Sequence, residues 1–484
     1  MKYLKITCIT FLAFLFSFTC FSQQISTYPG FNEEVKKNIT QDSTSKLKVS
    51  AILITGNKRT KSYIIAREMK FKIGDSIPAA RLFELVQQSR DLIHNTNLFS
   101  ETEVTPVIVS AKEVEMHVRV LEKFYLYPTP QFKLVDRNLN DWIKTYHADL
   151  NRVEYGAKFA HYNFSGRGDK LRIYLLNGYA RAVSFSYSAP YSNGALTEGF
   201  SVSGTYLQSR RLNYKTNYNN KAVEFKSDRF ARNNLNLGIS YQRRRGFFKK
   251  NSYSIFYNFI NVNDSIVSAV YNPNYLNSSK SSVGYFDLQY EYQYSNTNNI
   301  NYPLKGRIMK LAALKRGCGF SGGVNMLSLE GSHNLFLTHK RNWYSNFELL
   351  GNIKLPFKQP YVNQSQLGYR EFYLRGLEYY VIDGVAAAIA KYSLKKKLAS
   401  FAVPFPFHIK KIPTIPFTIY GKSFADMGYS YNKKEFDTML GNKFLYSGGI
   451  GFDIMGLYDA VMRIEYSFNQ LGEKGLFLHA KTFF

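Results

Sequence analysis

The chain has 484 residues, a formal net charge of +28 and a mean hydropathy of −0.28. Aromatic residues make up 16% of it, almost all of them the 38 Tyr and 39 Phe, which argues against a cytosolic enzyme with a Leu, Ile and Val core. After the first 22 residues, no apolar run approaches the roughly 20 residues that a membrane helix needs. The composition favours an all-β protein and is compatible with a membrane barrel.

The first 22 residues predict export. Lys2 and Lys5 form a basic start, Ile9 to Phe16 is apolar, and Cys20-Phe21-Ser22 is a cleavage site for a signal peptide. A lipoprotein anchored at Cys20 is the alternative. We interpret residues 1–22 as the signal peptide, whose removal takes two lysines and lowers the net charge from +28 to +26.

Few residues in the exported chain are suited to bind a metal or a cofactor. Cys318 is then the only cysteine, so neither an intramolecular disulfide nor a cysteine-based metal site is possible. The eight histidines lack the His-x-x-x-His spacing. We therefore expect no metal and no cofactor. After export, the excess positive charge points to lipid phosphates rather than nucleic acid, or to an ordinary solvated surface.

Residues 47–123 have the pattern of a small α+β domain, following a polar, flexible linker at 23–46. The expected order is β-α-α-β-β. A strand at 48–54 is followed by a helix that Thr60 caps and that ends near Met69. A second helix opens at Asp75 to Pro78, and strands follow at 100–109 and 113–122. A generic α+β domain of unrelated function is the alternative.

From residue 125 onward the sequence alternates with a period of two. Between Val283 and Ser295, apolar and aromatic residues occupy one face and Asp, Gln and Glu the other. This alternation is typical of a membrane barrel, with its apolar face outward and its polar face inward. A soluble sandwich also alternates, but it seldom needs as many residues as 125–484.

Candidate strands number 17, including 220–228, 232–242 and 252–260. Bacterial single-chain barrels have even strand numbers, so we interpret 252–260 as part of a surface loop, which leaves about 16 strands. Odd strands then run outward from the periplasm. This places Arg210-Arg211 and a basic cluster at the outer rim, where the cluster would contact lipopolysaccharide phosphates. The cluster is Arg243, Arg244, Arg245, Lys249 and Lys250; a solvated loop is the alternative.

Several motifs occur in a fixed order along the chain. They are Gly56-Asn57 and Arg67-Glu68 in the small domain, then Asn163 to Gly168, Tyr302 to Gly306, Leu374-Arg375-Gly376-Leu377, Phe424-Ala425-Asp426-Met427-Gly428 and the terminal Phe484. Together they resemble the BamA/TamA-type outer-membrane assembly and polypeptide-transport superfamily, the bacterial surface antigen family, with a single POTRA domain.

The resemblance implies a mainly β fold and a site inside it. A periplasmic POTRA domain at 47–123 would precede an outer-membrane β-barrel at 124–484. In the family, the sixth outer loop folds into the lumen and its arginine pairs with the aspartate of the strand motif, here Arg375 and Asp426. The alternation of side chains along this strand places Asp426 on the polar, lumen-facing side, which supports the pair independently. Asp453 and Glu465 are alternative partners for Arg375 on lumen-facing positions. Gly376 allows a tight turn, whereas Leu377 stands where the family has an aromatic residue.

The seam between the first and last strands is a second expected site. Pro128 and Pro130 lack backbone donors, which weakens the first strand where it must close against 475–484 and the terminal Phe484. The family's proposed route for clients is lateral opening of this seam. Alternatively, these prolines only end the connection from the small domain.

The leading functional hypothesis is a non-enzymatic insertase or translocator. The POTRA domain would capture unfolded outer-membrane or secreted client polypeptides, with periplasmic chaperones or accessory lipoproteins and outer-membrane lipid as further partners. A secretion pore of the two-partner type, dedicated to one protein, is the alternative. Gly319-x-Ser321-x-Gly323 matches the nucleophile elbow of hydrolases, followed by His333 and His339, but its surroundings lack the strand-to-helix turn which that elbow needs. A passive porin or adhesin would explain neither the POTRA domain nor the Arg-Gly loop.

Overall fold

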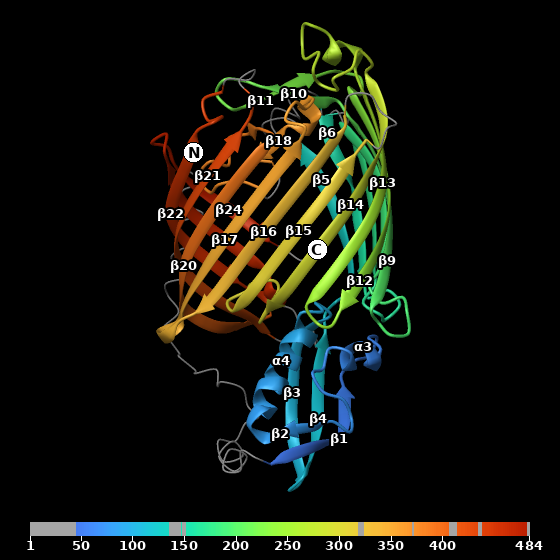
Figure 1. Cartoon of the computed structure of the whole chain (residues 1–484), viewed down its shortest axis with the longest axis vertical. Helices are drawn as coiled ribbons and strands as arrows, with labels where there is room; N and C mark the ends of the chain where they lie inside the picture. Colours follow the sequence, from blue (N-terminus) through green and yellow to red (C-terminus); the bar gives the residue numbers. More distant parts are fainter. Residues whose placement is uncertain are drawn as a thin grey trace.

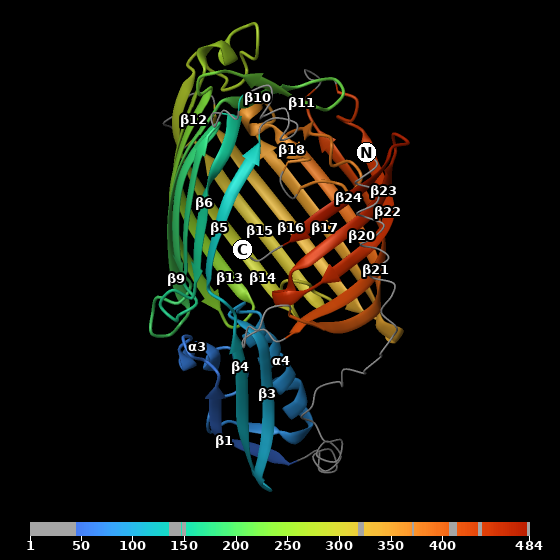
Figure 2. The same cartoon turned by 180° about the vertical axis from the view of Figure 1, so that it is seen from behind.

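The computed structural model describes residues 45–134, 147, 152–317, 324–369, 372–405, 414–433 and 438–481. They form a small N-terminal domain beneath one end of a large barrel-shaped sheet (Figures 1 and 2). We call this end of the barrel the domain end and the opposite end the far end. The expected signal peptide, most of the linker, the motif around Ser321 and the terminal Phe484 lie outside the described residues.

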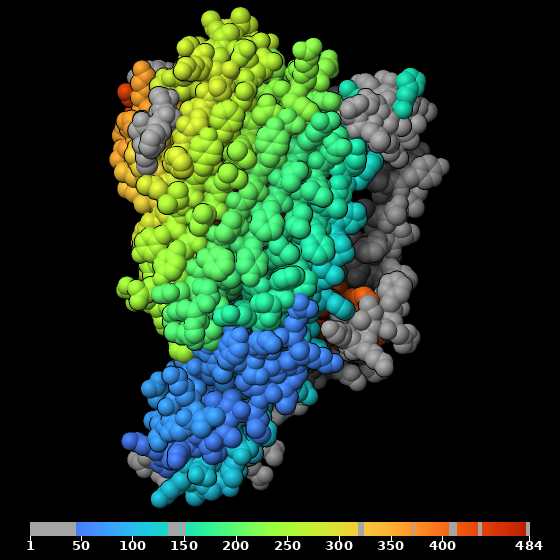
Figure 3. Space-filling view, turned by 90° about the vertical axis from the view of Figure 1, so that its right-hand side faces the viewer, coloured from blue at the N-terminus to red at the C-terminus, as the bar shows by residue number. Residues whose placement is uncertain are grey.

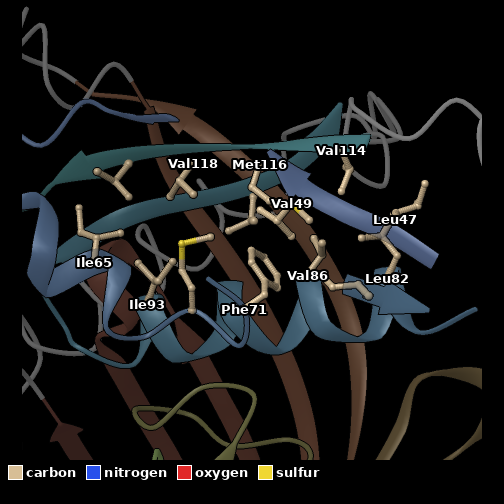
Figure 4. Close-up of a cluster of buried hydrophobic side chains, with 14 of the residues drawn as sticks. Leu47, Val49, Ile65, Phe71, Leu82, Val86, Ile93, Val114, Met116 and Val118 are labelled. Carbon is tan, nitrogen blue, oxygen red and sulfur yellow. The ribbon is translucent and has the colours of Figure 1, made fainter. Parts of the chain in front are cut away.

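The N-terminal domain is a four-stranded sheet covered by helices. Its sheet order is β2-β1-β4-β3, with β1 and β4 parallel. Val114, Met116 and Val118 alternate inward from β4 and pack with α4, so the core lies between sheet and helices (Figure 4). The elements are β1 (Lys46–Thr55), α3 (Ser62–Ala66), β2 (Ser76–Pro78), the 3-10 turn η1 (Ala79–Arg81), α4 (Leu82–His94), β3 (Phe99–Ser110) and β4 (Glu113–Glu122).

Two expected local details of this domain are wrong. Thr60 does not cap α3, because its hydroxyl donates to Glu122 Oε1 (2.7 Å) and the helix begins two residues later. Residues 76–78 form β2 rather than the start of a helix, since pairing with β1 places Ile77 in the core. The second helix begins only at Leu82.

Within the described residues, the barrel has sixteen strands, each antiparallel to its neighbour, which confirms the expected fold class. They are β5 (Leu126–Leu134), β6 (Val153–Tyr162), β7 (Lys170–Gly178), β8 (Ala180–Ala189), β9 (Glu198–Ser209), β12 (Arg232–Arg245), β13 (Lys249–Val262), β14 (Ser282–Thr297), β15 (Gly306–Arg316), β16 (Met326–Thr338), β17 (Trp343–Leu355), β20 (Ala386–Pro404), β21 (Thr414–Tyr431), β22 (Phe444–Met455), β23 (Val461–Asn469) and β24 (Lys474–Lys481).

The sixteen strands are not quite the sixteen expected. Residues 252–260, interpreted above as a surface loop, belong to β13, which pairs along its length with β12 and β14. Residues 220–228 contain β11 (Ala222–Lys226), whose one partner in the described part of the chain is β10 (Arg211–Thr216). Leu212 and Tyr214 of β10 pack on Ile266 and Leu276. The apolar residues of this hairpin therefore form the core of a cap over the far end of the barrel rather than part of the barrel wall.

This exchange of strands reverses the expected position of the basic cluster. With β13 included, β12 is the sixth strand and runs toward the domain end, so its hairpin with β13 lies beside the N-terminal domain. Figure 3 shows the N-terminal domain packed against this end of the barrel. The placement of residues 243–250 at the outer rim is therefore wrong, whereas Arg210-Arg211 do lie at the far end, beyond β9.

Side chains alternate along the barrel strands as expected. On β12, Leu237, Ile239 and Tyr241 are exposed on the outer face, and Gly238 and Ser240 lie between them on the inner face. Among the described residues, no helix is long and apolar enough to cross a membrane. The segment between β17 and β20 contains the short paired strands β18 (Ser365–Leu367) and β19 (Ile382–Asp383), and it carries the expected Arg-Gly motif.

Candidate functional site

The loop between β17 and β20 packs on the inner face of the barrel. Leu374 and Leu377 are almost completely buried and join an apolar cluster with Ile389 of β20 and Leu445 of β22. Leu377 thus packs in the barrel interior although the family favours an aromatic residue there. These contacts fix the loop on both sides of the motif arginine.

Arg375 and Asp426 form an ion pair at the centre of this loop. The guanidinium Nε donates to Asp426 Oδ2 (2.9 Å), its Nη2 contacts Oδ1, and the backbone N–H of Arg375 also donates to Oδ2 (3.0 Å). Nη1 donates to the Ser393 hydroxyl (2.9 Å), and the guanidinium lies 4.0 Å from the centre of the Phe424 ring. The side chain of Asp426 is 0% exposed and that of Arg375 11%, so the pair is nearly dry and bidentate.

Gly376 is required by both its conformation and its surroundings. Its φ is +82°, in the left-handed region, and an added Cβ would lie 3.0 Å from Cβ of Ser467. Its carbonyl accepts a hydrogen bond from Asn469 Nδ2 (2.8 Å), which ties the turn to the end of β23.

Asp453 and Glu465, the alternative partners expected for Arg375, form their ion pairs mainly with lysines. Lys422 Nζ contacts Asp453 and lies 2.7 Å from Glu465 Oε1, and Lys395 Nζ lies 3.1 Å from Asp453. Glu465 reaches Arg375 only at 4.0 Å. A second ion cluster therefore adjoins the Arg375–Asp426 pair, and the hydroxyl of Tyr302, from the turn after β14, donates to Asp453 (2.8 Å).

The loop also contacts the last strand. His479 of β24 lies 3.1 Å from Glu378 and stacks on Tyr373, while Tyr379 packs on Phe477. Glu378, Glu465 and His479 offer ligand atoms within 4.8 Å of one another, a grouping that suits a cation. Since Lys422 already neutralises Glu465, we interpret the grouping as part of the ion network.

The N-terminal domain is clamped to the domain end of the barrel by Glu68. This carboxylate, 1% exposed, accepts from Arg244 Nη1 (2.5 Å) and Nη2 (2.7 Å), from the Tyr191 hydroxyl (3.1 Å) and from Arg67 (3.1 Å). Burial and the neighbouring Glu68 raise the pKa of Tyr191 to about 12, so the phenol remains a donor at neutral pH. Arg244 is thus a domain contact rather than a lipopolysaccharide contact.

Further contacts reach other turns at the same end. Arg59 Nε donates to the Asn163 carbonyl (3.0 Å), and Asn163 Nδ2 donates to Thr60 (2.9 Å). At the turn between β22 and β23, His94 at the end of α4 pairs with Asp459 (3.0 Å). Burial opposes the charge of Asp459, but His94 and Lys123 hold the pKa of its carboxyl below the ordinary value. Through the contacts of Asn163 with Arg59 and Thr60, the motif at 163–168 helps to position the N-terminal domain.

Pro128 and Pro130 lie within β5 itself, not in the connection before it. The N–H of Tyr162 donates to the carbonyl of Tyr125, so odd residues of β5 face β6 and even residues face away from it. Both prolines thus remove donors from the free edge of β5. In the described part of the chain, β5 and β24 are the two edges of the sheet and are not paired with each other.

The residues considered for hydrolase chemistry are not brought together in the part of the chain that the structure describes. Ser321 lies outside it. His333 lies on the outer face of β16, and His339 Nε2 lies 2.7 Å from the Ser345 hydroxyl. Sequence reasoning missed Glu68, Lys422 and Tyr302 as site residues, although Glu68 and Tyr302 stand within motifs already noted.

The fold and its sites define an outer-membrane β-barrel with one POTRA domain. The family model described as Omp85 superfamily domain matches residues 163–456, and the POTRA model described as surface antigen variable number repeat matches 47–123. The chain therefore belongs to the Omp85 superfamily, whose members are transporters and assembly factors, with the POTRA domain in the periplasm. The comparison with curated proteins finds no match.

The solved structures that the chain matches include one BamA and two CdiB proteins. BamA from Haemophilus ducreyi lacking POTRA domains 1–3 is 14% identical, with a TM-score of 0.49 over 89% of this chain and 83% of that chain. CdiB from Escherichia coli is 10% identical, with a TM-score of 0.47 over 96% and 91%. CdiB from Acinetobacter baumannii is 10% identical, with a TM-score of 0.45 over 90% and 73%.

Proposed function

We propose that this chain inserts or translocates client polypeptides at the outer membrane, with the POTRA domain capturing the client and the barrel seam admitting it. The observation that carries the proposal is the weakened edge of β5 opposite a last strand that is held from inside by the Arg375 loop. An edge short of donors separates at lower cost than a continuous sheet. The loop contacts on His479 and Phe477 would keep β24 in place while a client segment enters between β24 and β5.

The capture site is the free edge of β3 in the POTRA domain. Among the described residues β3 pairs only with β4, and Val107, Ile108 and Val109 near its end are exposed. An extended client segment can add to such an edge through backbone hydrogen bonds and place apolar side chains on the exposed valines. The opposite edge is less suitable, because β2 has only three residues and ends in Pro78.

Depletion of the protein in its host tests the class of function. A general assembly factor predicts that many outer-membrane barrel proteins fall together in the quantified outer-membrane proteome. A dedicated secretion pore predicts the loss of one secreted protein with the rest unchanged. An unchanged outer-membrane and secreted proteome after full depletion would contradict both functions.

The double substitution Pro128→Val and Pro130→Val is expected to slow client insertion. It restores two donors on the free edge of β5, and at about 1 kcal/mol for each bond to β24 they favour a closed seam by roughly tenfold or more. The insertion rate of a reporter barrel into proteoliposomes measures the effect. Pro416→Val, in β21 and therefore not in an edge strand of the sheet, is the control. If the double variant inserts the reporter at the wild-type rate, the seam is not the entry route.

A further inference from the structure

The hairpin of β12 and β13 presents two different faces at the domain end. Period-two alternation turns Arg244 inward to Glu68, while Arg243 and Arg245 are exposed on the same outer face as Ile239 and Tyr241. On β13, Lys249 is exposed on the face of Tyr253. One hairpin therefore holds the POTRA domain with its inner face and offers three cations on its outer face.

A row of tyrosines lies next to these cations on the side of the membrane core. Tyr241, Tyr253 and Tyr290 are cross-strand neighbours on β12, β13 and β14, with ring centres 6.4 and 5.2 Å apart. Deeper still, Ile239 is 65% and Ile255 54% exposed on the outer face. Interfacial tyrosines mark the boundary of the hydrocarbon. At roughly 3.4 Å per residue, Arg243 and Arg245 lie about 7 and 14 Å beyond this row, at headgroup depth.

The cations form one patch across four strands. Lys249 is opposite Tyr294, and the guanidinium of Arg307 on β15 lies 5.1 Å from the centre of that ring. Glu198, opposite Arg243, is a carboxylate beside the patch. Arg243, Arg245 and Lys249 make no side-chain hydrogen bond or ion pair with the residues that the structure describes. The patch, Arg243, Arg245, Lys249 and Arg307, is therefore available to an external anion.

We propose that this patch binds the phosphates of anionic phospholipids in the periplasmic leaflet. The POTRA domain fixes the leaflet, because it contacts the same hairpin, and lipopolysaccharide belongs to the opposite leaflet. Arginine forks match phosphate oxygens in pairs, and each cation at a membrane surface strengthens binding by roughly fivefold at low salt. A lipid held here would lie directly beside the Arg244–Glu68 clamp and would steady the hairpin on which the POTRA domain docks.

Titration of the purified full chain with lipids, read by native mass spectrometry, tests the proposal. The test variant is Arg243→Gln, Arg245→Gln and Lys249→Gln together, which leaves Arg244 in place. The matched control, Lys280→Gln, Lys433→Gln and Lys443→Gln, removes three exposed positive charges at the far end. We expect the test variant to bind phosphatidylglycerol at least tenfold more weakly, with phosphatidylcholine binding unchanged and the control like wild type.

Three outcomes would overturn the proposal. They are wild-type phosphatidylglycerol affinity in the test variant, an equal loss in the control, or full competition by millimolar glycerol phosphate, which would indicate a site for free phosphate. Heat-modifiable migration on gels verifies that each variant is folded. If the triple variant does not fold, the single variants Arg245→Gln and Lys249→Gln are each expected to weaken binding about fivefold, and wild-type affinity in both contradicts the proposal.

Discussion

Replacement of Arg375 by glutamate is expected to prevent most of the protein from reaching its folded barrel form. The substitution places two carboxylates against each other at a position where Asp426 has no exposure to water. It also removes the donors to Ser393 and the cation on the Phe424 ring. Breaking a buried pair costs about 3–5 kcal/mol, a large share of the stability of most domains. Heat-modifiable migration and the outer-membrane proteome in cells measure the loss, and Asp426→Arg should fail similarly.

The double charge swap, Arg375→Glu with Asp426→Arg, separates pairing from mere crowding. It restores opposite charges, so we expect partial recovery over either single variant. Recovery stays incomplete because a glutamate at 375 cannot donate to Ser393 or lie on Phe424 as a cation. Lys340→Glu, on an exposed turn at the domain end, is the control for charge reversal and should behave as wild type. Wild-type behaviour of Arg375→Glu would show that the loop arginine contributes nothing to the barrel.

Much of the barrel can be predicted from local alternation, but its strand membership cannot. The period of two places Asp426 on the inner face of β21 and Tyr241 on the outer face of β12. Yet β13 carries Asn and Ser among its aromatics, and β11 has comparable alternation outside the barrel. What distinguishes them is long-range pairing, since β13 has neighbours on both edges and β11 has one short partner. Counting 220–228 instead of 252–260 as a barrel strand was enough to place the basic cluster at the wrong end of the barrel in the prediction.

The Arg375–Asp426 pair can be predicted from the sequence, whereas the Glu68–Arg244 contact cannot. Arg375 and Asp426 stand in motifs whose spacing and parity indicate both partners. Glu68 and Arg244 are 176 residues apart, and nothing local marks Arg244 within a run of three arginines. Only the end at which the hairpin closes, and the face on which its middle arginine lies, bring it to the POTRA domain. These two facts come from the tertiary fold.

Substitution of Glu68 by glutamine is expected to release the POTRA domain from its fixed position under the barrel. Glutamine keeps the shape of the side chain but leaves the guanidiniums of Arg67 and Arg244 without their shared carboxylate. Burial, and after it the neighbouring Arg244, already lowers the pKa of Arg67. At about 3–5 kcal/mol for an uncompensated buried charge, docking weakens by more than a hundredfold. The distribution of distances between spin labels attached at positions 112 and 340 measures docking. We expect this distribution to change from a single narrow population in the wild type to a broad one in the variant.

The double variant Glu68→Gln with Arg244→Gln decides whether charge or shape holds the domain. Removing Arg244 as well leaves Arg67 with its hydrogen bond to the Leu196 carbonyl (2.7 Å) and relieves the repulsion, so we expect docking to recover in part. Glu84→Gln, a change at an exposed carboxylate on α4, should leave the distances unchanged. A narrow distance distribution in Glu68→Gln, like that of the wild type, would mean that the contacts of Arg59 with Asn163 and of His94 with Asp459 are enough to dock the POTRA domain. The buried carboxylate would then not be what holds it.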